Sequence, residues 1–267
     1  MTNFIKSCII EVHLNNQTVK NLFYVSLFAL MCSSVAGQGL KTEIIGNKQL
    51  INLSREVPSF NHLRIVALDV DLQRGKMHSV SLTAESNIIE HIISKVEGDT
   101  LVIQFDRKQA LRNIENPKIT LTFSNLNSIL GSASNIRLLS PLENDSLLIK
   151  LQTKSSIEGT VKLNFLDLRM ATSCNAKLSG STNIAHAQLF TKSTLNAKKL
   201  LVNDLTLIEE THCRAELNVS EQLTAKLFAE STLENIGNAK PNIIYPSIDQ
   251  MTSLKFFNQN VDLYNFN

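Results

Sequence analysis

The stretch Ser134-Asn135-Ile136-Arg137-Leu138 decides the fold, because close copies of it return twice further along the chain. The copies are Cys174-Asn175-Ala176-Lys177-Leu178 and Cys213-Arg214-Ala215-Glu216-Leu217. Each copy begins at the end of a cluster of small or polar residues, and three more clusters lie between and beyond them. The six clusters are Gly131-Ser132-Ala133-Ser134, Thr153-Lys154-Ser155-Ser156, Ala171-Thr172-Ser173-Cys174, Thr191-Lys192-Ser193-Thr194, Glu210-Thr211-His212-Cys213 and Ala229-Glu230-Ser231-Thr232. Their last residues are 22, 18, 20, 19 and 19 positions apart, a period typical of a β-solenoid.

The segments before the clusters alternate as half-buried strands do. Leu147, Ile149 and Leu151 are expected to point into the core, and the residues between them outward. Residues 126–240 are therefore predicted to form a parallel β-helix, an all-β, single-chain solenoid with about 20 residues per coil. Because alternate clusters resemble each other more closely, a coil of about 40 residues is the alternative.

The last residues of the clusters are predicted to form one structural ladder at a corner of the coils. Its members are Ser134, Ser156, Cys174, Thr194, Cys213 and Thr232. Small side chains allow a tight turn, and hydroxyl groups can bond to neighbouring backbone. With 20 residues per coil, Cys174 and Cys213 lie two coils apart and stay free thiols. With 40 residues they are neighbours and can form a disulfide.

The rest of the chain after residue 56 also has β patterning. Residues 57–125 are expected to contain several strands, with a short helix at 86–93 and a loop at 106–118. The predicted β-helix domain covers residues 57–256, and residues 257–267 form a C-terminal tail. A solenoid needs covered ends, for which 38–56, a linker or cap, and 86–95 are the N-terminal candidates. Pro241 and Pro246 interrupt the repeat at the other end.

The N-terminus is predicted to be a secretory signal peptide, residues 1–37. Lys20 precedes an apolar run from Leu22 to Cys32, and small residues follow it. The run is too short to cross a bilayer. A start codon placed too far upstream, with true initiation near Val19, would explain the unusually long segment before the run. The mature chain is expected to have no transmembrane segment and to reside in the periplasm, on the outer-membrane surface or outside the cell.

Composition limits the classes of function. Apolar residues make up 43% of the chain, which supports a packed core, and aromatic residues only 6%. The net charge is +2 without a basic stripe, which argues against a nucleic-acid partner. After cleavage only Cys174 and Cys213 remain, too few for a disulfide scaffold.

No arrangement of residues predicts catalysis, a cofactor or a metal site. The histidines lack metal-ligand spacing, and the chain has neither a phosphate-binding glycine loop nor a nucleophile elbow. His212 beside Cys213 is a local coincidence, expected to be structural. A polysaccharide lyase or hydrolase on the same scaffold is the alternative function, and it would require acids clustered on one face.

Three features make the chain similar to a known family, the "putative auto-transporter adhesin head domain" or GIN domain of bacterial envelope proteins. They are the opening segment 60–84, the strand pair at 101–103 and 119–122, and the recurring clusters with the ending at 236–243. This resemblance implies a right-handed parallel β-helix, export, and a role in adhesion, binding or scaffolding. Most clusters here lack the glycine that the family has beside the serine. A surface glycan or an envelope protein is the expected partner.

Overall fold

The computed structural model describes residues 43–245, which form a β-solenoid of about 19 residues per turn. The predicted signal peptide, the start of the predicted linker and the C-terminal tail lie outside the described residues. The strands are β1 (Glu43–Ile45), β2 (Leu50–Glu56), β3 (His62–Val66), β4 (Val70–Arg74), β5 (Ser79–Glu85), β6 (Ile92–Glu97), β7 (Thr100–Phe105), β8 (Ala110–Arg112), β9 (Lys118–Phe123), β10 (Ser128–Ser132), β11 (Asn135–Leu138), β12 (Leu142–Gln152), β13 (Ser156–Ala171), β14 (Asn175–Phe190), β15 (Thr194–Glu209), β16 (Arg214–Leu227), β17 (Thr232–Asn235) and β18 (Pro241–Ile244).

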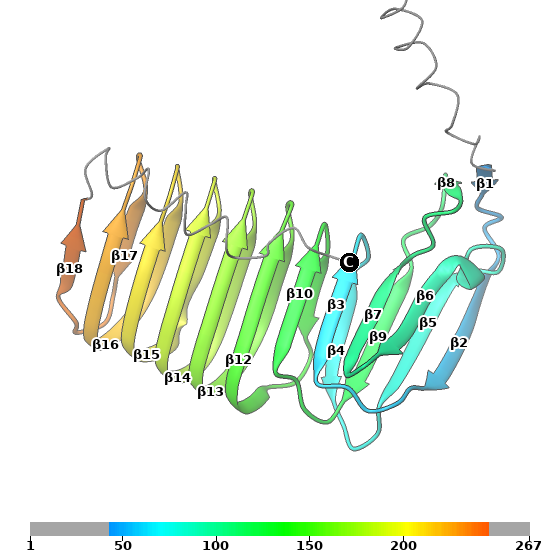
Figure 1. Ribbon diagram of the computed structural model, residues 1–267, viewed down its shortest axis with the longest axis horizontal. Helices are drawn as coiled ribbons and strands as arrows, with labels where there is room; N and C mark the ends of the chain where they lie inside the picture. The colour runs from blue at the N-terminus through cyan, green and yellow to red at the C-terminus, as the bar shows by residue number, and fades with distance from the viewer. Residues whose placement is uncertain (1–42, 246–267) are drawn as a thin grey trace, which may run out of the picture. The chain divides into compact units, whose positions relative to one another are not determined.

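The strands form two faces that enclose one core (Figure 1). The first sheet runs β2-β5-β9-β4-β11, continues through the N-terminal halves of β13 to β16, and ends at β17. The second sheet runs β6-β7-β3-β10-β12, continues through the C-terminal halves of the same long strands, and ends at β18. Each long strand therefore bends from one sheet into the other.

The parallel solenoid predicted from the repeat is confirmed, as is its shorter period. Ser156, Asn175, Thr194, Arg214 and Thr232 are successive register partners on neighbouring strands. One coil is thus about 19 residues long, and the 40-residue alternative is wrong. Cys174 and Cys213 are free cysteines, as the shorter period requires.

The core follows from the alternation of apolar residues. Leu147, Ile149 and Leu151 are at most 1% exposed, and the residues between them face outward. In the next coil the register partners of these three are Leu166, Leu168 and Met170, which are also buried. Every coil therefore adds a layer of aliphatic side chains to the same core, and burial of apolar area holds the layers together.

The N-terminal coils are stacked in an order that differs from the order of the chain. Strands β3 and β4 lie between the coil made by β7 and β9 and the coil made by β10 and β11. The chain therefore forms the β3–β4 coil first. It then forms the β7–β9 coil on the N-terminal side of that coil, and the β10–β11 coil on its opposite side. The helix expected at 86–93 is only a single 3₁₀ turn, Ile89–His91. The expected loop at 106–118 contains β8, which pairs with β1.

Antiparallel strands occupy the N-terminal end of the stack. β2 pairs antiparallel with β5, and β6 pairs antiparallel with β7, so these two strands are the outermost in their sheets. At the other end the interruption expected at Pro241 was wrong. Pro241 is the first residue of β18, which pairs with β16. Proline is tolerated at the first position of an edge strand, where its missing N–H costs no ladder bond.

The small-residue clusters form tight corners between the second sheet of one coil and the first sheet of the next. Most corners contain two consecutive residues with positive φ, among them Thr153 and Lys154, Thr172 and Ser173, and Thr191 and Lys192. This conformation favours glycine, and other residues adopt it at a cost of about 1 kcal/mol each. The corners explain why the clusters recur in the sequence and why they reject bulky apolar side chains.

Candidate binding site

Charged side chains of successive coils form one row on the outer surface of the first sheet. The order of this charged row, set by the strand register, is Asp71, Arg137, Glu158, Lys177, Asn196, Glu216 and Glu234. Neighbouring strands are about 4.8 Å apart, and the sign of the charge alternates over the first four positions. Neighbours in this part of the row therefore attract each other.

Ion pairs hold both ends of the charged row. The Arg137 guanidinium donates two hydrogen bonds to the Asp71 carboxylate, each 2.7 Å long, and these bonds raise the arginine pKa. At the other end the Lys198 ammonium lies 3.3 Å from Glu216 and 3.2 Å from Glu234. Hydrogen bonds from Arg214 and then Lys198 lower the pKa of Glu216, and hydrogen bonds to Glu234 and Glu216 raise that of Lys198. The Glu216 carboxylate is therefore stable as an anion.

A second row of amide and hydroxyl groups lies two residues earlier on the same strands. This polar row contains Asn135, Ser156, Asn175 and Thr194, followed by Arg214 and Thr232. A hollow of about 470 Å³ lies between the polar row and the charged row. It shares Asn135 and Arg137 with a second hollow of about 650 Å³ over β4, β5 and β9. The two hollows together form a polar groove that crosses the strands.

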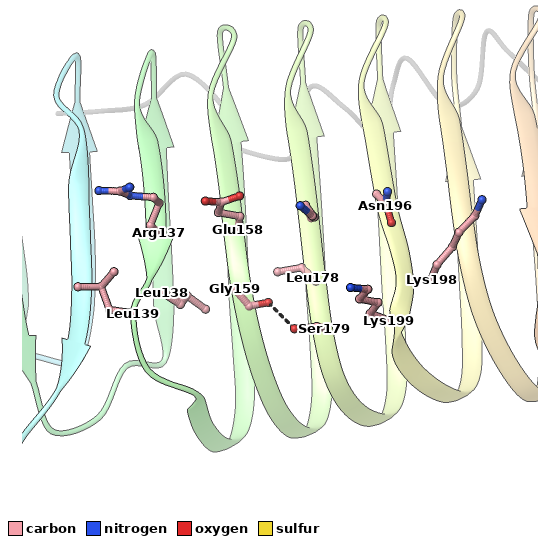
Figure 2. A pocket seen from close by; sticks show the side chains of 11 residues that line it. Arg137, Leu138, Leu139, Glu158, Gly159, Leu178, Ser179, Asn196, Lys198 and Lys199 are labelled. Carbon is pink, nitrogen blue, oxygen red and sulfur yellow. Dashed lines mark hydrogen bonds between the residues drawn. The ribbon is translucent and has the colours of Figure 1, made fainter.

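A third hollow of about 530 Å³ borders the charged row on its other side, and we name it the lysine pocket (Figure 2). Its lining includes the buried Leu138 and Leu178 and the exposed Leu139. Four cationic side chains reach it, those of Arg137, Lys177, Lys198 and Lys199, with Glu158 as a counter-charge. The lysine pocket thus combines an apolar floor with a mainly cationic rim.

Irregular backbone shapes the lysine pocket. Register partners change from Lys177 and Asn196 to Ser179 and Lys199, so β15 carries one more residue than β14 here. Such a β-bulge re-aims side chains: Lys199 extends toward Ser179 on β14, and Lys198 extends the opposite way, toward Glu216 and Glu234 (Figure 2). In β13, on the other side of β14, Gly159 has a φ of 150°, and a Cβ there would overlap the Leu138 side chain.

The comparisons with known proteins agree with this architecture. The family model described as "Putative auto-transporter adhesin, head GIN domain" matches residues 60–239. The chain belongs to this GIN-domain family. No curated protein matches the chain. The adhesin description of the family indicates a cell-surface or exported protein. No helix within residues 43–245 is long and apolar enough to span a membrane.

Solved structures share the fold of this GIN-domain protein. A "putative adhesin" from Bacteroides fragilis NCTC 9343 has a TM-score of 0.63 and 20% identity, over 75% of this chain and 100% of its own. A "putative adhesin" from Parabacteroides distasonis ATCC 8503 has a TM-score of 0.59 and 14% identity, over 75% of this chain and 98% of its own. A "putative lipid binding protein" from the same strain has a TM-score of 0.54 and 14% identity, over 76% of this chain and 100% of its own.

The predicted corner ladder of the GIN domain needs a correction. Register places Ser156, Thr194 and Thr232 in the outward polar row, one residue beyond the inward position. Ser134, Cys174 and Cys213 do face inward and are each 1% exposed. The true inward column is Ser134, Ser155, Cys174, Ser193, Cys213 and Ser231. The six predicted residues therefore belong to two adjacent columns.

Hydrogen bonds in the inward column explain why alternate clusters resemble each other. The Ser155 hydroxyl accepts a bond from the Ser134 N–H at 3.2 Å, and the Ser193 hydroxyl accepts one from the Cys174 N–H at 3.3 Å. Ser231 accepts the equivalent bond from the Cys213 N–H at 3.1 Å. Serine hydroxyls thus join the coils in pairs, and the column is architectural.

A ladder of amide side chains, which the repeat pattern had not predicted, lies at the corner of the coils opposite the small-residue clusters. The Asn164 amide donates to the Asp145 carboxylate at 2.5 Å, and the Asn183 amide donates to the Asn164 carbonyl at 3.0 Å. Asn203 continues this line and accepts from Ser220 at 3.3 Å. The recurrence of Asn at positions 164, 183 and 203 was a usable signal.

His212 and Cys213, the adjacent residues considered for thiol or metal chemistry, do not share one environment. Cys213 is buried, and burial raises its thiol pKa to about 11. The adjacent His212 side chain is half exposed and lies 3.1 Å from Glu230. Within residues 43–245, no group of three or more His, Cys, Asp or Glu could hold a metal ion.

A carboxyl group without a hydrogen-bond partner among the described residues lies inside the core. Glu209 is fully buried between its register partners Leu189 and Leu227. Both of its carboxylate oxygens lack a hydrogen-bond partner among the described residues. Burial raises its pKa to about 8, so the carboxyl is largely protonated at neutral pH. Because it cannot reach solvent, it is unavailable to a ligand on either sheet.

Proposed function

We propose that this GIN-domain protein is an exported, non-catalytic adhesion module that binds a surface glycan in the polar groove of its first sheet. The observation that carries the proposal is the register of the polar row and the charged row. Amide, hydroxyl and charged groups recur at every strand, about 4.8 Å apart, along both walls of the groove. A surface of this kind suits an extended polymer with polar repeating units.

The composition of the groove supports a glycan rather than a protein partner. Protein interfaces have apolar and aromatic residues at their centres. The described residues that line the two hollows of the groove include no aromatic side chain. Without aromatic platforms each sugar unit binds weakly, so affinity would come from many units along the groove and from many copies of the protein.

The electrostatics of the groove support binding without catalysis. A glycosidase general acid needs a raised pKa, but ion pairs lower the pKa of Glu216 and hold Asp71 against Arg137. A lyase base needs a neutral amine at neutral pH, and the raised pKa of Lys198 keeps it protonated. These groups are therefore better suited to act as fixed charges than to transfer protons.

A tryptophan placed in the groove should weaken glycan binding strongly. Asn175 is exposed in the middle of the polar row, so Asn175→Trp fills the groove without touching the core. We expect at least a tenfold loss of binding on a glycan array, about 1.4 kcal/mol or more. The matched control is Gln188→Trp, on the outer face of the second sheet.

Two outcomes would contradict the proposal. An equal loss of glycan binding in both tryptophan variants would show that the first sheet is not the binding surface. Release of reducing ends or unsaturated products from a bound glycan would show that the protein is a carbohydrate-active enzyme and not a non-catalytic adhesion module.

A further inference from the structure

We propose that the lysine pocket binds a negatively charged group carried on a sugar unit, so that the glycan held by the first sheet is acidic. This inference rests on the proposed function, and it adds the chemical class of the ligand. Neither the fold nor the polar groove requires an acidic ligand. The argument comes from the charges, the backbone and the floor of the pocket.

Two lysines of the pocket have no ion-pair partner in the described part of the chain. Arg137 is neutralised by Asp71, and Lys198 by Glu216 and Glu234. Lys177 and Lys199 have no such partner within residues 43–245, and both side chains are exposed at the pocket. Among residues 43–245, Glu158 is the only acid that lines the pocket, and it is the register neighbour of both Arg137 and Lys177. Arg214 also pairs with Glu216, so the positive charges of Lys177 and Lys199 exceed the negative charge of Glu158 and the pocket keeps a net positive charge.

A β-bulge positions one of these two lysines, Lys199. The bulge in β15 shifts its outward residues by one position and presents Lys199 beside Ser179. The Ser179 hydroxyl is fixed by a bond to the Gly159 carbonyl at 3.2 Å (Figure 2). Bulges often occur beside binding sites because they redirect side chains.

The remaining lining matches the body of a sugar. Leu139, which is 55% exposed, supplies an apolar surface on which the C–H face of a sugar ring can pack. Ser179 and Asn196 supply hydroxyl and amide groups at the edge. An anion attached to a polar ring would therefore satisfy the cations, the polar edge and the floor together. Attraction between exposed charges is screened by salt, so binding should weaken at high ionic strength.

The acidic group could be a carboxylate or a phosphate, and the experiment separates these sources. The full-length mature protein is applied to an array that carries oligogalacturonate, alginate and hyaluronan as carboxylates, and phosphomannan as the phosphate. Galactan, mannan and cello-oligosaccharides serve as neutral probes. The test variant is Lys177→Gln with Lys199→Gln. Its control is Lys150→Gln with Lys226→Gln, which removes equal charge from the outer face of the second sheet.

We expect binding to acidic probes that falls about tenfold in the Lys177/Lys199 variant and stays unchanged in the control. Preference for carboxylate or for phosphate probes then identifies the source of the anion. Binding to neutral probes alone, or acidic binding that both variants retain, overturns the inference and leaves the adhesion module in place. Failure to bind any glycan overturns the proposed function and this inference together.

Discussion

Replacing Glu209 with leucine should stabilise the protein by about 3 kcal/mol at pH 7. The folded protein holds this carboxyl at a pKa of about 8, whereas its ordinary value is 4.5. Between these values the unfolded chain has released the proton and the folded chain keeps it. Unfolding therefore releases a proton, and stability falls as the pH rises from about 4.5 to about 8. Leucine removes this penalty and fits between Leu189 and Leu227.

The variant Glu209→Gln separates the charge from the packing. It removes the titrating proton but leaves a polar group in the core. Urea unfolding of the wild-type protein should show stability falling by about 3 kcal/mol from pH 5 to pH 8 relative to this variant. At pH 4 the difference that comes from titration should nearly vanish. Parallel stability curves for wild type and Glu209→Gln would show that the carboxyl does not titrate in the folded state as described.

Replacing Gly180 with alanine should destabilise the protein by about 3 kcal/mol or more. Gly180 has a φ of 105°, and its added Cβ would overlap the carbonyl oxygen of Val161 on the adjacent strand. Val161 and Gly180 are register partners, so relief of the overlap requires the β13 and β14 backbones to separate. That separation breaks ladder hydrogen bonds in the middle of the solenoid.

Gly98→Ala is the matched control for Gly180→Ala. Gly98 also has a positive φ, 64°, but a Cβ there meets no atom within 4 Å. Backbone strain alone should cost about 1 kcal/mol in this variant. Urea midpoints of the two variants measure the contrast. Equal losses would mean that close approach of the strands at Gly180 contributes nothing beyond the backbone conformation.

The period of the solenoid could be predicted from the sequence, but the register of the corner could not. Each corner turns through residues of positive φ, and the inward residue follows them directly, as Ser155 follows Lys154. In this cluster Ser155 and Ser156 are both small and polar, so composition does not distinguish the inward residue from the outward one. Burial and the ladder hydrogen bonds do.

The lysine pocket and the order of the first coils depend on pairing that has no local signature. The sequence Asn196-Ala197-Lys198-Lys199 continues an alternating strand, and the bulge becomes visible only against the register of β14. Likewise, β3 and β4 acquire neighbours on both sides only because the segment between β4 and β10 folds back. Long-range pairing of this kind is decided by the packing of whole coils.

The groove, the lysine pocket and both proposals depend on one physical arrangement, in which residues about 19 positions apart lie side by side on adjacent coils. Engineered cysteines measure it directly. Lys162 and Ser181 are exposed register partners, about 4.8 Å apart at their Cα atoms, which is within disulfide range. Lys162→Cys with Ser181→Cys should oxidise to an intramolecular disulfide in the folded protein, detected by mass spectrometry of the digested protein. Lys162→Cys with Leu201→Cys, two coils apart, should remain reduced. A disulfide in the second pair and none in the first would contradict the stacking.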